Sequence, residues 1–312
     1  MKKLKKNLAL LMAFVMLFAC LTACGKKEEA TSEKKEDVTT TVTTYPLELT
    51  DSYGNVVTIE KEPEKVVSCA PNITEMMYDL GAGDKLVGRT DYCDYPAEAL
   101  EVQSVGLIDN PDIEMIISLE PDVVIATTFS DEGIATLSSA GIPVVVLHEE
   151  GSVEGVYTML SDLGKVVNKN EEASTLVQDM KDTISHVQEV VADLEKPTVY
   201  YVVGYGEYGD YTAGGDTFVG GIIELAGGDN IAKDISGWNI TLEEIIEADP
   251  DIIIISEYIK DDFMSAPNYC ELTAVKEERV YTIDINMLER QGYRNAKGIE
   301  TLAQIFYPEA FE

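Results

Sequence analysis

The sequence predicts an α/β protein built from two Rossmann-like lobes that are joined by one long α-helix. Three observations support this fold class: short apolar runs alternate with helical segments, one pattern occurs twice, and an unbroken helical stretch separates the two copies. Runs that are apolar on both faces are typical of parallel strands buried between helices. The recurrence indicates two similar lobes rather than one large domain.

The repeated pattern is a short helix, a Pro-Asp break and a buried strand. Its copies occupy residues 112–126 and 241–255, a separation of 129 residues. Each copy carries a glutamate, Glu114 or Glu243, seven residues before its proline. Acids in equivalent places on two lobes are what a partner with two-fold symmetry could bind.

Residues 1–24 are expected to be a lipoprotein signal peptide and not part of the fold. Four lysines precede the apolar run Leu8–Leu21, which is shorter than the ~20 residues that span a bilayer. The run leads into Leu-Thr-Ala-Cys-Gly, which resembles the bacterial lipobox, so Cys24 is the predicted lipidation site. Cys20 is a poorer match, because Phe18, two residues before it, is bulky where small residues are usual; an ordinary secretory signal is the alternative. Two acyl chains would anchor the protein without a transmembrane helix.

Residues 25–44 contain mainly Lys, Glu, Ser and Thr and are predicted to be a disordered tether, because they offer little apolar surface to bury. Without the four signal lysines the formal charge changes from −34 to −38. Such acidity argues against nucleic acid and anionic lipid as ligands, and it suits a basic docking surface on a partner.

The first lobe is predicted to span residues 45–168. It starts with a hairpin at 47–59, whose alternating residues flank a Gly-Asn turn. Asn72 is the expected N-cap of the first helix, with Glu75 at the capping-box spacing. The remaining strands are expected near 65–68, 86–88, 122–126 and 143–147, and the helices near 73–80, 113–118, 131–140 and 153–167.

A linker helix is predicted within residues 169–196, because apolar residues recur at helical spacing and neither Gly nor Pro interrupts them before Pro197. About 24 helical residues would make a rod of ~36 Å that permits little hinge bending between the lobes. The second lobe then spans residues 197–312. Its strands are expected at 198–203, 251–256 and 280–283, and its helices near 216–226, 241–248 and 296–306.

The loop Gly204–Gly209 matches G-x-G-x-x-G after a strand, but it is not predicted to bind a dinucleotide. That motif requires a helix to open at the glycines, whereas here the next helix is expected only near Asp216. The loop carries Tyr205 and Tyr208, with Tyr211 close behind, and favours an aromatic wall at the mouth of a cleft. A solvent loop with incidental tyrosines is the alternative.

Almost the whole mature chain resembles the cobalamin- and iron-chelate-binding proteins of ABC importers, the class whose lobes are joined by a single helix. The resemblance is carried by residues 68–75 (Ser-Cys-Ala-Pro-Asn-Ile-Thr-Glu), 91–96 (Asp-Tyr-Cys-Asp-Tyr-Pro), both Glu…Pro-Asp copies, and 217–230. It implies that Glu114 and Glu243 dock onto arginines of an ABC permease dimer, which works with its ATPase subunits. Residues 91–96 most resemble the cobalamin-binding branch.

The glutamates also have a structural interpretation, because a carboxylate in a first helical turn gains about 0.3–1 kcal/mol from the helix dipole. In the second copy, however, Thr241 and Glu244 already have capping-box spacing, which leaves Glu243 free to face outward. Docking is therefore the preferred interpretation.

The expected ligand is a metal chelate held between the lobes by aromatic faces and bidentate donors in loops that follow strands. A corrinoid is the first choice, because the chain has only four arginines and so disfavours highly anionic siderophores. A ferric siderophore or haem is the alternative. Arg290 and Arg294 share a loop after the last predicted strand. For these two arginines, salt bridging on an acidic surface is an equally good interpretation. The predicted ligand-binding residues are Asn72, Tyr92, Tyr95, Tyr205, Tyr208, Trp238, Arg290 and Arg294.

No bare-metal site, cofactor or catalytic residue is predicted. The two histidines, His148 and His186, are far apart, although His148 ends a strand and could be an axial ligand to a chelated metal. Cys69, Cys93 and Cys270 form no C-x-x-C pair, so a disulfide framework is not expected, while a single bridge stays possible. A surface α/β enzyme is the rival interpretation, but G-x-S-x-G and the P-loop motif are absent.

The sequence thus predicts a non-catalytic solute-binding lipoprotein, anchored by lipid on the extracytoplasmic face of a bacterial cell membrane. It would capture a metal chelate and deliver it to an ABC permease.

Overall fold

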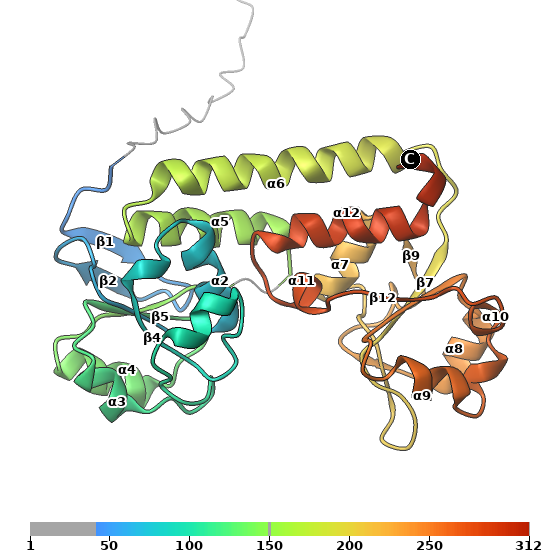
Figure 1. Cartoon of the computed structure of the whole chain (residues 1–312), viewed down its shortest axis with the longest axis horizontal. Coiled ribbons are helices and arrows are strands. Elements are labelled where there is room, and N and C mark those ends of the chain that lie inside the picture. The colour runs from blue at the N-terminus through green and yellow to red at the C-terminus, as the bar shows by residue number, and fades with distance from the viewer. Residues whose placement is uncertain (1–41, 149–150, 312) are drawn as a thin grey trace, which may run out of the picture. The chain divides into compact units, whose positions relative to one another are not determined.

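The computed structural model of the chain describes residues 42–148 and 151–311, which belong to one compact unit covering Thr40–Glu312. Each of two lobes is centred on a four-stranded parallel sheet, and a long helix, α6, runs past both (Figure 1). The predicted fold class is confirmed.

The sheet of the first lobe has the strand order β4-β3-β5-β6. A separate antiparallel hairpin, β1 (Leu47–Thr50) and β2 (Val56–Ile59), confirms the predicted one. The sheet strands are β3 (Val66–Ser68), β4 (Leu86–Arg89), β5 (Val123–Ala126) and β6 (Val144–Val146). The helices are α2 (Pro71–Asp79), α3 (Ile113–Ser118), α4 (Asp131–Ser139) and α5 (Val153–Val166), with 3₁₀ turns η1 (Gly83–Lys85) and η2 (Ala97–Glu101).

The linker helix α6 (Asn170–Val191) is 22 residues long and lies within the predicted range 169–196. It buries one apolar stripe, including Val177, Met180, Ile184 and Val187, against the first-lobe helix α5 and the second-lobe helix α12. One rigid helix therefore packs on both lobes, and its length at 1.5 Å per residue is about 33 Å.

The sheet of the second lobe has the order β9-β7-β11-β12. Its strands are β7 (Thr198–Val202), β9 (Asp229–Asn230), β11 (Ile252–Ile255) and β12 (Val280–Thr282), and β8 (Asp210–Tyr211) pairs separately with β10 (Asn239–Ile240). The helices are α7 (Phe218–Leu225), α8 (Leu242–Ala248), α9 (Lys260–Ser265), α10 (Thr273–Lys276), α11 (Asn286–Glu289) and α12 (Arg294–Phe306), with η3 (Tyr269–Glu271) and η4 (Pro308–Ala310).

The sequence repeat corresponds to a repeat of structure. In both sheets the chain builds its strands in the spatial order second, first, third, fourth, and every pair is parallel. In each copy an acid with positive φ, Glu120 at 51° or Asp249 at 37°, follows the helix and comes just before the Pro-Asp pair. Ile116 and Ile245, at the same place in the two copies, are both fully buried.

The predicted N-cap of α2 is wrong. The N-cap is Ala70, and Pro71 occupies the first helical turn, where its missing N–H costs nothing. Asn72 and Glu75 therefore lie inside the helix, and both are buried. Their polar groups make contacts with the other lobe, which are described below.

The predicted signal peptide, with Cys24 and Cys20, lies outside the described residues, as does most of the predicted tether. Near the end of that tether, the backbone N–H of Thr43 donates to Asn168 and its hydroxyl donates to the carbonyl of Lys165. Within residues 42–148 and 151–311, no helix has the length and hydropathy that a membrane crossing needs.

Candidate functional site

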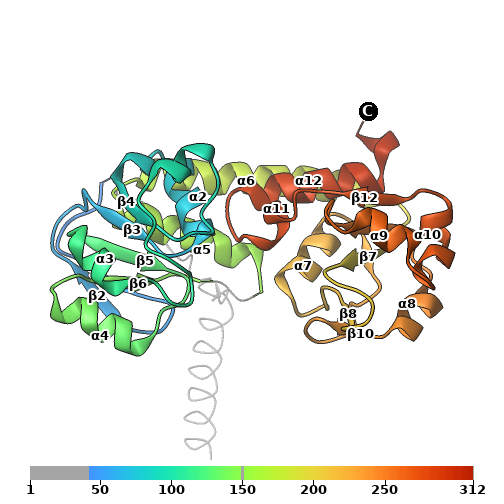
Figure 2. The ribbon, with the colours of Figure 1, turned by 60° about the horizontal axis from the view of Figure 1, so that its bottom comes forward.

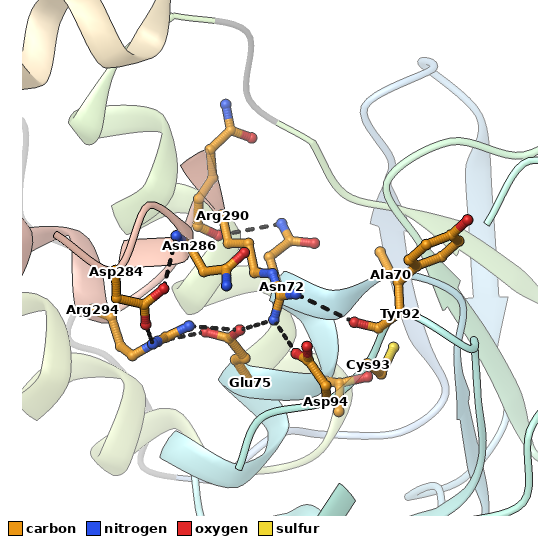
Figure 3. Close-up of polar contacts among 12 residues, drawn as sticks. Ala70, Asn72, Glu75, Tyr92, Cys93, Asp94, Asp284, Asn286, Arg290 and Arg294 are labelled. Carbon is orange, nitrogen blue, oxygen red and sulfur yellow. Dashed lines mark hydrogen bonds and ion pairs between the residues drawn. The ribbon is translucent and has the colours of Figure 1, made fainter. Parts of the chain in front are cut away.

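The segment around α11 and the start of α12 reaches from the second lobe to helix α2 of the first. Figure 3 shows the ion pairs and hydrogen bonds that result. We call five of these residues the inter-lobe cluster: Glu75, Asp94, Asp284, Arg290 and Arg294.

Glu75 is the centre of the inter-lobe cluster. Its carboxylate accepts hydrogen bonds from Arg290 Nη1 at 2.8 Å, from Arg294 Nε at 2.8 Å and from Arg294 Nη2 at 2.9 Å. The side chain is only 4% exposed, so its charge needs these partners. The fork of Arg294 binds both oxygens of the carboxylate, a geometry that lysine could not reproduce.

The loop after β4 brings more groups to the same arginines. Arg290 donates to Asp94 Oδ1 at 2.7 Å and to the carbonyl of Tyr92 at 3.3 Å. The hydrogen bond from Arg290 lowers the pKa of the Asp94 carboxyl. The guanidinium of Arg294 lies 4.1 Å from the ring centroid of Tyr95, in cation–π geometry. Tyr92 and Tyr95, in the same loop, are 55% and 45% exposed beside the cluster.

Asn72 extends this network to the second lobe. Its side-chain amide donates to the carbonyl of Gln291 at 3.2 Å. The side chain of Gln291 also lines a pocket of about 600 Å³, which we call the second-lobe pocket. This volume lies in the range of small-molecule sites. The pocket is lined by Val203, Asp216, Thr217, Phe218, Val219, Gly237, Trp238, Glu289 and Gln291.

The structure gathers some of the predicted ligand residues and separates others. Asn72, Tyr92, Tyr95, Arg290 and Arg294 meet at the boundary between the lobes, and Trp238 lies 41% exposed in the adjoining pocket.

Tyr205 and Tyr208 are neither in the inter-lobe cluster nor among the residues that line the second-lobe pocket. The ring of Tyr205 packs edge-on against Phe263 at 5.0 Å and Tyr269 at 5.3 Å, inside the apolar cluster of the second lobe. Tyr208 is 85% exposed. The loop that carries both leads into strand β8 and not into a helix, which agrees with the rejection of a dinucleotide site.

Glu75, Asp94, Asp284 and Gln291 belong to this site and were not predicted from the sequence. Glu75 had a usable signal, because a carboxylate between the apolar residues Ile73 and Met76 on one helix is expected to need a partner, and the chain has only four arginines. Asp94, Asp284 and Gln291 carried no such signal.

Glu114 and Glu243 lie in the first turns of α3 and α8, and both side chains are exposed. Other residues cap these helices: Asp112 accepts from the N–H of Met115, and Thr241 forms the predicted capping box with Glu244. Among the described residues, neither glutamate has a side-chain hydrogen bond or ion pair. Helix capping therefore does not account for them.

The described parts of the chain contain no group of three or more His, Cys, Asp and Glu arranged to hold a metal ion. His148 packs edge-on against Tyr53 of the β1–β2 turn, with ring centroids 5.9 Å apart. The thiols of Cys69, Cys93 and Cys270 are free. Burial, with a smaller contribution from Cys93, raises the pKa of the Cys69 thiol to about 12, which keeps it protonated and unreactive.

The model of the periplasmic binding protein family matches residues 66–286. An uncharacterised ABC-transporter substrate-binding lipoprotein of Bacillus subtilis is 34% identical, and the match covers 97% of each chain. A cobalamin-binding protein of Halobacterium salinarum is 32% identical over 67% of this chain and 58% of its own. Among solved structures, a periplasmic solute-binding protein from Veillonella parvula superposes with a TM-score of 0.71 at 28% identity, covering 85% of this chain and 88% of that one.

Proposed function

Because the chain belongs to the periplasmic binding protein family, we propose that it is the solute-binding subunit of an ABC importer and that its solute is a metal chelate, preferably a corrinoid. The chelate would lie between the lobes, against the second-lobe pocket and the exposed edge of the inter-lobe cluster. The similarity to a lipoprotein of an ABC transporter and to a cobalamin-binding protein supports this proposal.

The observation that carries the choice of ligand is the charge of the site. The inter-lobe cluster and the second-lobe pocket together contain five carboxylates, from Glu75, Asp94, Asp216, Asp284 and Glu289, against the two guanidinium groups of the cluster. A polyanionic ferric siderophore, or haem with its two propionates, would meet net repulsion there. A corrinoid carries neutral amides at its rim and, as cobinamide, a positive charge.

The aromatic groups at the site also suit a flat macrocycle. Trp238 offers a partly exposed indole in the pocket, and the exposed rings of Tyr92 and Tyr95 lie on the first-lobe side. Such side chains provide large apolar faces together with hydrogen-bonding rims. Tyr205, which packs against Phe263 and Tyr269, would contact the ligand only after the loop between β7 and β8 has moved, whereas the exposed Tyr208 is already accessible.

The ligand assignment is tested by titrating cyanocobalamin, cobinamide, haemin and several ferric siderophores into the purified protein. Binding to proteins that keep the single tryptophan, Trp238, is followed by its quenching and by calorimetry, and binding to a variant without it is followed by calorimetry alone. We expect one corrinoid per protein and a loss of at least tenfold in affinity for Trp238→Ala. Tyr258→Ala, which removes an exposed aromatic outside the site, is the matched control. Tight binding of a ferric chelate or haemin without corrinoid binding would reject the corrinoid and leave the importer role in place.

The protein would deliver its solute by docking on a permease dimer that works with ATPase subunits. The exposed and unpaired Glu114 and Glu243, at equivalent places in two lobes of the same topology, support this part of the proposal. Replacing both by lysine should abolish uptake while ligand affinity stays within a few-fold, since charge reversal at a basic surface turns attraction into repulsion. Uptake that survives the double reversal would exclude these residues as docking groups.

We place the protein on the extracytoplasmic face of the membrane, held by lipid on Cys24. Its role there is capture and delivery without turnover. Release of altered product from a bound chelate in a cofactor-supplemented assay would instead favour an enzyme.

A further inference from the structure

An isoleucine lies one helical turn after each proposed docking glutamate. Ile117 on α3 is 36% exposed and Ile246 on α8 is 49% exposed, and the two occupy the same position in the sequence repeat. Residues three apart share one face of a helix, so each isoleucine lies beside its glutamate, Glu114 or Glu243. The core contact of each helix is made by the preceding, fully buried isoleucine. Ile117 and Ile246 are therefore not needed to hold their helices on the core, and a solvent-facing helix position normally carries a polar residue.

In the first lobe this face borders a groove of about 650 Å³ between α3 and α4, which we call the α3–α4 groove. Ile113, Ile117 and Phe129 give it apolar walls, and Asp109, Glu114 and Glu132 give it acidic ones. No lysine or arginine is among its lining residues. A side chain that is apolar along its length and basic at its end, or an apolar residue next to a basic one, fits these walls.

We propose that each lobe docks on the permease through an acidic–apolar pair, Glu114 with Ile117 and Glu243 with Ile246, and that the permease presents a basic and an apolar side chain to each pair. This inference rests on the proposed function and adds the apolar contact to it. The α3–α4 groove receives the apolar side chain in the first lobe.

The two members of a pair have different tasks. The glutamates steer the encounter, because charges at an interface mainly change the rate of association and its dependence on salt. The isoleucines lose their water only in the final complex, so they mainly slow dissociation. Figures 1 and 2 show α3 and α8 in separate lobes, which gives the permease dimer one pair for each of its halves.

The test measures binding of the full-length lipoprotein, in detergent, to the permease–ATPase complex of its importer immobilised in nanodiscs. We expect Ile117→Ser with Ile246→Ser to weaken binding about tenfold or more through faster dissociation, with an unchanged salt dependence. The pair of Ile→Leu substitutions, which keeps the apolar area, should stay within about twofold. Leu194→Ser is the matched control, because Leu194 is 39% exposed and lies outside both pairs.

The double variant Glu114→Lys with Glu243→Lys is measured in the same assay. It should slow association with the permease and flatten the salt dependence of the association rate. If this variant is impaired while the isoleucine-to-serine variant binds like the wild type, the apolar half of the pair is rejected and docking through the glutamates stands. If neither double variant changes binding, both this inference and the docking face fail. Thermal unfolding checks each variant, and the single isoleucine variants replace the double one if it does not fold.

Discussion

Asp122 and Asp251 occupy the same position in the two copies of the repeat, and each fixes the start of the neighbouring strand. The carboxylate of Asp122 accepts hydrogen bonds from the backbone N–H groups of Glu64 and Lys65, directly before β3. The carboxylate of Asp251 accepts from the N–H and the hydroxyl of Thr198, the first residue of β7. The Pro-Asp break therefore does more than end a helix. Its aspartate fixes the start of β3 or β7, the strand that pairs with the strand following the aspartate, β5 or β11.

Asp122→Asn should lower the free energy of unfolding by about 1–2 kcal/mol, since an amide accepts these N–H groups less strongly than a carboxylate. Burial alone would raise the pKa of Asp122, but hydrogen bonds from Lys61 and the two backbone groups lower it below its ordinary value. The charge of Asp122 therefore stabilises the fold at a pH above the carboxyl pKa of the unfolded chain, about 3.9. This stabilisation is lost as the pH falls through the lower pKa of Asp122 in the folded protein. Urea unfolding at pH 7 and at pH 3 measures both effects. An equal loss at the two pH values would contradict the role of the charge.

Glu75→Gln should destabilise the protein by about 2–4 kcal/mol, because it leaves two largely buried guanidinium groups without their shared carboxylate. The loss is limited by Asp94 and Asp284, which stay bound to Arg290 and Arg294. Asp284→Asn is the control: its side chain is 48% exposed, so we expect a loss of less than about 1 kcal/mol. Chemical denaturation of the two variants gives the comparison. Equal losses would show that Glu75 is not the centre of the inter-lobe cluster.

Asp79→Asn should stabilise the protein at neutral pH. Burial, helped by the nearby charge of Glu75, raises the pKa of Asp79 to about 6, and its Oδ2 has no hydrogen-bond partner among the described residues. A raised carboxyl pKa means that the folded state prefers protonated Asp79. The free energy of unfolding is therefore highest, as far as Asp79 is concerned, at low pH, and it falls as the pH rises through about 6.

We therefore expect Asp79→Asn to add on the order of 1–2 kcal/mol at pH 7.5 and close to nothing at pH 4, measured by urea unfolding. The exposed Asp84, changed in the same way, should leave stability unaltered at both pH values. A stabilisation that does not depend on pH would point to helix propensity as its cause.

Cys24→Ser should release the protein into the soluble fraction or leave its precursor uncleaved, because the thioether that carries the lipid cannot form. Labelling of cells with a radioactive fatty acid and fractionation of membranes measure this. Cys20→Ser is the matched control and should remain anchored. Normal lipid labelling of the Cys24→Ser variant would show that Cys24 is not the anchor and would make Cys20 the next candidate.

The sequence was sufficient for much of the fold and for less of the site. Buried strands such as β5 and β11, and helices such as α3 and α8, follow from local apolar patterns and caps, and their predicted positions are confirmed within one or two residues. Two-residue strands such as β8 and β9 carry too few residues for a pattern, and none was predicted.

Asn72 illustrates why the site was harder to predict. Its capping-box spacing to Glu75 is a local signal, but the helix starts at Pro71, two residues earlier than predicted, and both side chains contact the other lobe. Their partners, Gln291 and the two arginines, lie more than 200 residues away in the sequence. No local rule connects residues at that separation.

The same separation imposes an order on assembly. Arg290 follows Glu75 by 215 residues, so during export, amino end first, the first lobe can complete its sheet long before its buried carboxylate has a partner. Until the last part of the chain arrives, α2 presents Glu75 to water together with Met76, whose side chain borders Gly292 in the complete fold. A chain cut short before α11 would keep a native-like first lobe with this open face, which makes it a substrate for surface proteases and prone to aggregation. Arg290 and Arg294 thus complete the surroundings of Glu75 in the first lobe as well as the proposed binding site.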